Sequence, residues 1–158
     1  MQTQKAETLA RIFSDVLADL AFMFTDEEDI ACESLQDPWL ETTIGYEGVE
    51  ASGMLRLRCT RRFTQLLSIN LLGADPDVTP SETQSNDAVR EFMNIVCGQL
   101  VTAIHGTSAV FDLTIPVVTP LGGPPDFDES DGVAAATVSV EQCRLQLLYT
   151  PGVTVTRP

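Results

Sequence analysis

Histidine and cysteine are scarce in this sequence, and their scarcity limits the metal sites that it can build. The 158 residues contain one histidine, His105. The four cysteines form no C-x-x-C pair and are spread along the chain: Cys32, Cys59, Cys97 and Cys143. A structural zinc site needs about four clustered Cys or His ligands. We therefore predict no metal site.

Basic residues are also few. Nine Lys and Arg residues stand against 23 Asp and Glu residues, which gives a formal net charge of -14 at pH 7. The long-range field of such a chain repels polyanions. We therefore exclude nucleic acids and anionic membrane surfaces as partners and expect binding through local contacts.

Long apolar runs are missing as well. The first residues, "MQTQKAETLA", lack a basic stretch leading into an apolar one, and the later run "VLADLAFMF" is short and contains Asp19. A membrane-spanning helix needs about 20 predominantly apolar residues. We predict neither a signal peptide nor a membrane span, and because free thiols suit a reducing compartment, we expect the protein in the cytoplasm.

What the sequence does contain suits one globular domain. Apolar residues make up 44% of the chain, and 158 residues is near the usual size of a single folded unit with one core. We predict one domain over residues 1–158.

Two kinds of periodicity alternate along the first half of the chain. Residues 5–24 carry apolar side chains three and four positions apart, which predicts a helix. Residues 39–46 and 53–60 alternate apolar and polar side chains, which predicts a hairpin of two strands. From residue 61 the helical spacing returns, and Gly73 ends this second helix.

After a third helix, described below, the chain is again strand-like. Residues 110–118 predict a strand at a sheet edge or a strand end, because Pro116 has no amide hydrogen. Residues 133–141 and 143–150 predict a closing hairpin. The order α, β-β, α, α, β, β-β predicts an α+β fold, in which two long helices pack on one face of a mostly antiparallel sheet.

The third helix covers residues 86–106, "NDAVREFMNIVCGQLVTAIHG", with Ser85 or Asn86 as its N-cap and Gly106 at its end. At about 100° per residue, its apolar residues gather on one side. This side, which we predict to be core, comprises Val89, Phe92, Met93, Val96, Leu100, Ala103 and Ile104. The opposite side comprises Asp87, Glu91, Asn94, Gly98, Thr102 and His105.

Glu91 and Asn94 lie one turn apart on the polar side, so their side chains point into the same volume. Gly98 follows on the same stripe, although a glycine inside a helix costs roughly 1 kcal/mol relative to alanine. One interpretation is that something outside the helix packs close to its backbone at Gly98. The other is a solvated face, with a glycine that packs against another element of the chain.

The pattern Glu91-x-x-Asn94-x-x-x-Gly98 resembles the signature helix of the CheC/CheX/FliY family of chemotaxis phosphatases, and the CheX-like branch fits best. The likeness covers residues 61–118. It consists of an apolar helix ending in Leu-Leu-Gly, an acidic loop, an Asp at the start of the next helix, the E-x-x-N-x-x-x-G stretch, and a strand containing Ile-Pro. Many relatives have Asn after the glycine, where this sequence has Gln99.

The resemblance implies a phosphatase that hydrolyses the aspartyl phosphate of a CheY-like response-regulator receiver domain. Asn94 would orient the attacking water, Glu91 would pair with the receiver's active-site lysine, and Gly98 would let the partner approach the helix. The resemblance also implies no cofactor of the protein's own, Mg²⁺ in the receiver, and a homodimer. The alternative is a non-catalytic module of the same fold that binds a receiver or another signalling partner.

The resemblance also concerns the number of sites. CheC-type relatives carry two E-x-x-N helices, whereas this chain has the motif once. We therefore interpret the N-terminal helix as a degenerate counterpart and expect one site per chain.

The remaining candidates have plainer interpretations. His105 lies about 16 Å along the helix from Asn94, too far to act with it. Cys97 adjoins the core side, so we predict a buried thiol. The tract "DFDESD" has the acids of a calcium loop without its spacing, and we predict a turn. Four bases form either a docking patch or a solvated strand face: Arg56, Arg58, Arg61 and Arg62.

Overall fold

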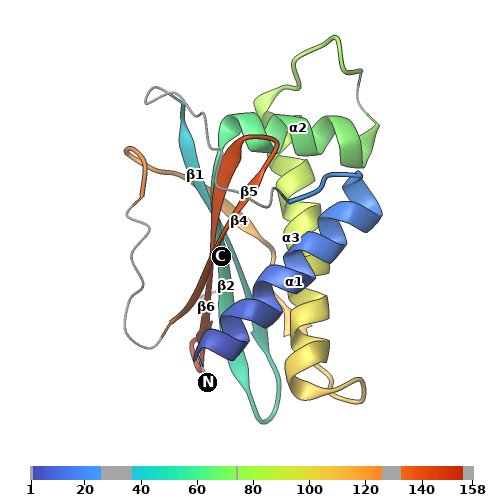
Figure 1. Cartoon of the computed structure of the whole chain (residues 1–158). Helices are drawn as coiled ribbons and strands as arrows, with labels where there is room; N and C mark the ends of the chain where they lie inside the picture. The colour runs from blue at the N-terminus through green and yellow to red at the C-terminus, as the bar shows by residue number, and fades with distance from the viewer. Residues whose placement is uncertain (1, 26–36, 74, 126–132, 155–158) are drawn as a thin grey trace.

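Figure 1 shows the computed structural model of the chain, which describes residues 2–25, 37–73, 75–125 and 133–154. This part contains three helices: α1 (Gln2–Ala21), α2 (Arg61–Leu72) and α3 (Glu82–His105). It also contains six strands: β1 (Trp39–Glu47), β2 (Ser52–Thr60), β3 (Asp112–Leu113), β4 (Val117–Pro120), β5 (Ala134–Val140) and β6 (Cys143–Pro151).

The strands form one sheet, and the helices lie on one face of it (Figure 1). The strand order is β3-β1-β2-β6-β5, β4 also pairs with β1, and every pairing between the described strands is antiparallel. The two long helices are α1, of 20 residues, and α3, of 24 residues, while α2 is a shorter third helix of 12 residues. The predicted α+β architecture is confirmed.

Alternation along the strands separates the two faces of the sheet. Leu55 and Leu57 of β2 are fully buried in the core, while Arg56 and Arg58, which alternate with them, lie on the face turned away from the helices. β1 pairs with β2 in a register that sets Ile44 opposite Leu55, so apolar side chains of both strands meet on the helix side. Burying this face is what holds the helices on the sheet.

The two halves of the chain are arranged alike around the centre of the sheet. β2 and β6 form the central pair, and β1 and β5 flank them. The first half runs α1-β1-β2 and the second half ends in β5-β6, with α3 before it. α1 packs on β5 and α3 packs on β1, so each long helix covers the outer strand of the other half. Exchanging the halves would leave the order of these four strands unchanged.

α3 begins four residues earlier than the sequence predicted. Its N-cap is Ser81, whose side chain accepts a hydrogen bond from the Gln84 amide at 3.1 Å, while the Ser81 amide donates to Gln84 Oε1 at 2.9 Å. This S-x-x-Q capping box satisfies two amides that would otherwise lack partners. The predicted caps were wrong: Ser85 is buried inside the helix, and Asn86 Oδ1 accepts a hydrogen bond from Arg61 at 2.8 Å.

α1 ends at Ala21 rather than at residue 24. Phe22 adopts a left-handed backbone with φ 52°, and the Met23 amide then donates to the Leu17 carbonyl at 3.1 Å. Met23 is 1% exposed. Its apolar side chain therefore reaches the core through this turn, which explains why the sequence pattern extends beyond the helix.

The strand predicted over residues 110–118 is interrupted. β3 and β4 pair with β1 on either side of Thr114, whose amide donates to the Gly45 carbonyl at 2.9 Å. The Thr114 hydroxyl accepts a hydrogen bond from the Gly45 amide at 2.8 Å, so a side chain takes the place of a backbone partner before Pro116. The sequence predicted a sheet edge or a strand end at Pro116, and Pro116 lies between two short strands at the edge of the sheet. The tract "DFDESD" and Cys32 lie outside the described residues.

Candidate functional site

The polar stripe of α3 faces outward. Glu91 and Asn94 are exposed and Gly98 is half-buried, whereas Phe92, Met93 and Val96 beneath them are fully buried. Within the described residues, neither Glu91 nor Asn94 makes a hydrogen bond or an ion pair. A carboxylate and an amide on one helix face are therefore available to a partner, as the sequence predicted.

Gly98 has open space around it. A Cβ atom built at this position has no neighbouring heavy atom within 4 Å. The interpretation that this glycine packs against another element of the chain is therefore wrong for the part that the structure describes. The Gly98 carbonyl accepts a hydrogen bond from the Thr102 hydroxyl at 3.0 Å, which turns that hydroxyl onto the helix. The helix surface at Gly98 therefore carries no projecting side chain, and we call it the bare surface at Gly98.

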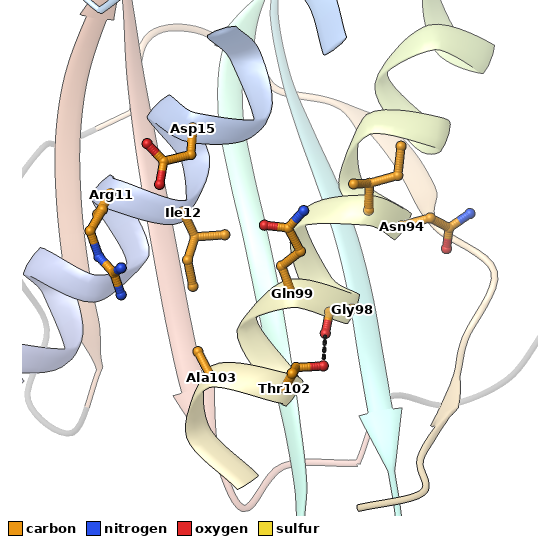
Figure 2. A pocket seen from close by; sticks show the side chains of 9 residues that line it. Arg11, Ile12, Asp15, Asn94, Gly98, Gln99, Thr102 and Ala103 are labelled. Carbon is orange, nitrogen blue, oxygen red and sulfur yellow. Dashed lines mark hydrogen bonds between the residues drawn. The ribbon is translucent and has the colours of Figure 1, made fainter. Parts of the chain in front are cut away.

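A hollow of about 590 Å³ runs between α1 and α3 and extends over Gly98 to Asn94. Figure 2 shows its two walls, with Arg11, Ile12 and Asp15 projecting from α1 and Gln99 extending between the helices. The Asn94 side chain points to the other side of α3, away from α1 (Figure 2). Because Gly98 has no side chain, nothing at this position separates the end of the hollow at Asn94 from the end at α1. A partner lying there would contact both Asn94 and α1.

The lower end of this hollow corrects the predicted core side of α3. Ala103 is exposed and lines the hollow, whereas Ile104 is half-buried and packs against the core, as predicted. Cys97 and Val101 are buried as well. The core side is shifted from the predicted one because α3 packs against α2, α1 and β1, which the helix's own sequence does not reveal.

His105 belongs to a partly buried aromatic cluster at the end of α3. Its Nε2 atom lies 3.1 Å from Tyr46 Oη, which lies 2.6 Å from Tyr149 Oη. Its ring also packs against Phe111, with centroids 4.9 Å apart. The placement of His105 on the free polar side was therefore wrong, because the helix end turns its ring into this cluster.

Burial shifts the titration of this cluster. It raises the pKa of the Tyr46 and Tyr149 hydroxyls, and it raises the pKa of the Cys97 thiol to about 12. Cys97 is fully buried, as predicted. A thiol that stays protonated inside the core has no nucleophilic role.

The cluster of four arginines does not adjoin the hollow. Arg58 Nε donates to Glu41 at 2.7 Å and Arg56 lies 4.0 Å from the same carboxylate, on the sheet face turned away from the helices. Arg62 reaches Cys143 Sγ at 3.7 Å. None of them lines the hollow beside Asn94. The solvated strand face is therefore the better description of Arg56 and Arg58.

In residues 2–25, 37–73, 75–125 and 133–154, no three His, Cys, Asp or Glu side chains gather into a group that could hold a metal ion. No helix in these ranges is long and apolar enough to cross a bilayer.

Comparison with known proteins identifies the family. The family described as "Chemotaxis phosphatase CheX" matches residues 40–124, which is more than half of the chain. The chain belongs to the CheX family. No curated protein matches it in sequence.

Solved structures share the CheX fold at low sequence identity. CheX from Vibrio vulnificus is 17% identical, with a TM-score of 0.70 over 96% of this chain and 98% of that chain. A CheC-like protein from Shewanella sp. PV-4 is 19% identical, with a TM-score of 0.69 over 97% and 100%. CheX in a CheX-CheY-BeF₃-Mg²⁺ complex from Borrelia burgdorferi is 17% identical, with a TM-score of 0.60 over 92% and 96%.

α1 of this CheX family member matches α3 in its pattern of buried residues. Five buried residues of α1 are Leu9, Ile12, Phe13, Val16 and Leu17, and Ala21 at the helix end is buried as well. Each of the five lies 84 positions before a buried residue of α3: Met93, Val96, Cys97, Leu100 and Val101. The same offset sets Glu7 against Glu91 and Ala10 against Asn94. This agrees with a counterpart of α3 that keeps the carboxylate and lacks the amide.

Gly98→Ala should raise the free energy of unfolding by up to about 1 kcal/mol, because alanine is the better helix former and the site is open. Gly53→Ala provides the contrast, because its Cβ would lie 2.6 Å from the Tyr46 ring and should cost about 1–3 kcal/mol. Urea unfolding of the two variants measures both effects. A loss of stability in Gly98→Ala would show that this glycine packs within its own chain.

Proposed function

We propose that this protein hydrolyses the aspartyl phosphate of a CheY-like receiver domain. The observation that carries the proposal is the pair Glu91 and Asn94, which stand exposed and unpaired, within the described part of the chain, beside the bare surface at Gly98. Membership of a family described as chemotaxis phosphatases supports it. A CheX of similar fold has been solved in complex with CheY, BeF₃ and Mg²⁺, which supports the choice of partner.

The proposed chemistry requires little of this chain. Water attacks the phosphorus atom, the bond from phosphorus to the aspartyl oxygen breaks, and the products are inorganic phosphate and the free carboxylate. Because such transfers depend mostly on positioning and charge, an oriented water is the missing component. The Asn94 amide can both donate to and accept from that water. Mg²⁺ would belong to the receiver, and this chain would supply no metal.

Glu91 is proposed to set the docked position. One turn before Asn94 and exposed, its carboxylate would pair with the active-site lysine of the receiver. The pair would hold α3 against the receiver so that Asn94 enters the phosphorylation site. This division gives one residue the role of docking and the other the role of orienting water. Action on a receiver would place the protein in the cytoplasm.

The alternative is a receiver-binding or scaffold module that hydrolyses nothing. Both readings require docking through α3, and only the phosphatase requires Asn94 for turnover. Measuring phosphate release from a phosphorylated receiver separates the two. A scaffold would leave the receiver's own rate of dephosphorylation unchanged, whereas a phosphatase would raise it.

Asn94→Ala should lower the single-turnover rate of receiver dephosphorylation by about 10² or more, the scale of losing one preorganised hydrogen-bonding group. Receiver affinity should change much less. Asn70→Ala is the matched control, since it removes an exposed amide from α2. If folded Asn94→Ala hydrolyses at the wild-type rate, the proposed mechanism is wrong.

Glu91→Gln should weaken receiver binding and turnover together, because it removes the charge and keeps the shape of the side chain. Binding of the wild type should also weaken with added salt, as expected of a charge pair at an exposed site. Glu50→Gln makes the same charge change in the exposed β1–β2 turn and should have little effect. Equal loss in the two variants would point to the overall field instead of a contact at Glu91.

We further propose that the protein forms a homodimer through its sheet. β5 is an edge strand: apart from the bridge between Thr25 and Val140, no described segment pairs with its outer side, and such edges readily pair with another chain. Sedimentation at micromolar concentration should show a species of twice the 17.2 kDa chain mass. A strictly monomeric species would contradict the proposal.

A further inference from the structure

The basic side chains of the described residues are nearly all engaged within the chain. Arg56 and Arg58 pair with Glu41, Arg61 donates to Asn86, and Arg90 pairs with Asp87. Arg62 contacts Cys143 Sγ and Lys5 lies over the Tyr149 ring. Arg144 also has an interaction partner. Arg11 is the exception in the part of the chain that the structure describes, since it makes no hydrogen bond, ion pair or ring contact.

An arginine without a partner is unexpected in this chain. Acids outnumber bases by 23 to 9, so carboxylates are abundant. Asp15 lies one helical turn from Arg11 on the same side of α1, a spacing that permits an ion pair, yet none forms. The Arg11 guanidinium is exposed, and its five N–H donors are free to bind a group outside the chain.

The position of Arg11 connects it with the proposed site. Arg11 and Asn94 line the same hollow, from α1 and from α3, with the bare surface at Gly98 between them. Figure 2 shows Arg11 projecting from α1 on the wall across from α3. Arg11 is the one basic residue among those that line this hollow. A partner that docks on Asn94 and extends across the bare surface at Gly98 therefore reaches Arg11.

We propose that Arg11 is a docking residue that binds a carboxylate on the receiver surface next to the phosphorylation site. This rests on the proposed function. A guanidinium forms two parallel hydrogen bonds with a carboxylate, which gives geometry as well as attraction. Asp15 in the same hollow repels a second acid placed one turn further along α1. The pair therefore selects receivers by the position of one acidic side chain, through attraction at Arg11 and repulsion at Asp15.

The test measures affinity for CheY-like receivers loaded with beryllofluoride and Mg²⁺, which mimic the phosphorylated form and are not hydrolysed. Arg11→Glu should weaken binding about tenfold or more and reduce its salt dependence. Arg62→Glu makes the same charge change at the start of α2, outside the hollow, and should change affinity less than twofold. With phosphorylated receiver, Arg11→Glu should raise KM and leave kcat within twofold.

A second variant and a charge exchange exclude trivial causes. Arg11→Gln keeps the length of the side chain and should weaken binding less than Arg11→Glu does. A receiver in which the contacted acid is replaced by lysine should bind Arg11→Glu better than it binds the wild type. Unchanged affinity in Arg11→Glu, equal losses in Arg11→Glu and Arg62→Glu, or a fall in kcat without a change in affinity would each overturn the proposal.

The outcome also separates this inference from the phosphatase proposal. If the wild type binds an activated receiver without accelerating phosphate loss, and Arg11→Glu abolishes that binding, the docking role stands and the phosphatase role falls. If turnover depends on Asn94 while Arg11→Glu binds normally, the phosphatase role stands and the docking role falls. If no activated receiver binds the wild type, both fall.

Discussion

The packing of α1 against α3 on the sheet is the constraint on which the candidate site depends. Phe13 and Phe92 meet edge to face in the core, with ring centroids 5.1 Å apart and planes at 89°. Both rings are fully buried, and removing such a ring costs about 3–5 kcal/mol. The contact fixes how far apart the helices lie and how each is rotated. The hollow above it, with walls from both helices, follows from that spacing.

This packing explains why polar residues on the outer side of α3 can remain unpaired within the described chain. α3 is anchored by its buried side and by the Ser81 capping box, so its outer stripe contributes little to folding. Glu91 and Asn94 are therefore available for binding without loss of stability. Gly98 even lowers the stability of α3, and it makes no close contact that would compensate for this within the described chain. This agrees with the proposal that a partner approaches the helix closely at Gly98.

The sequence predicts what depends on local spacing and misses what depends on neighbours. The alternation of Leu55 and Leu57 with arginines and the helical spacing of Phe92 and Val96 predicted strand, helix and buried side correctly. Ala103 was placed in the core because its helix alone cannot show that α1 leaves a hollow there. The S-x-x-Q signal at Ser81 was readable in the sequence and was missed. The free state of Arg11 could not be read, because pairing depends on distances between side chains.

The local charge of the hollow removes an objection that the net charge raises. A chain with a formal charge of -14 should repel a partner whose site carries a phosphoryl group on an aspartate. At physiological ionic strength, however, exposed charges are screened beyond about 8 Å, so nearby side chains decide. The hollow contains one base, Arg11, and one acid, Asp15, among otherwise neutral residues. The charges that line it therefore cancel, and Glu91, the exposed acid one turn from Asn94, would face the receiver lysine in the proposed complex. The lining thus adds no net repulsion toward an acidic partner, and the neutral amide of Asn94 adds none where the phosphoryl group would lie.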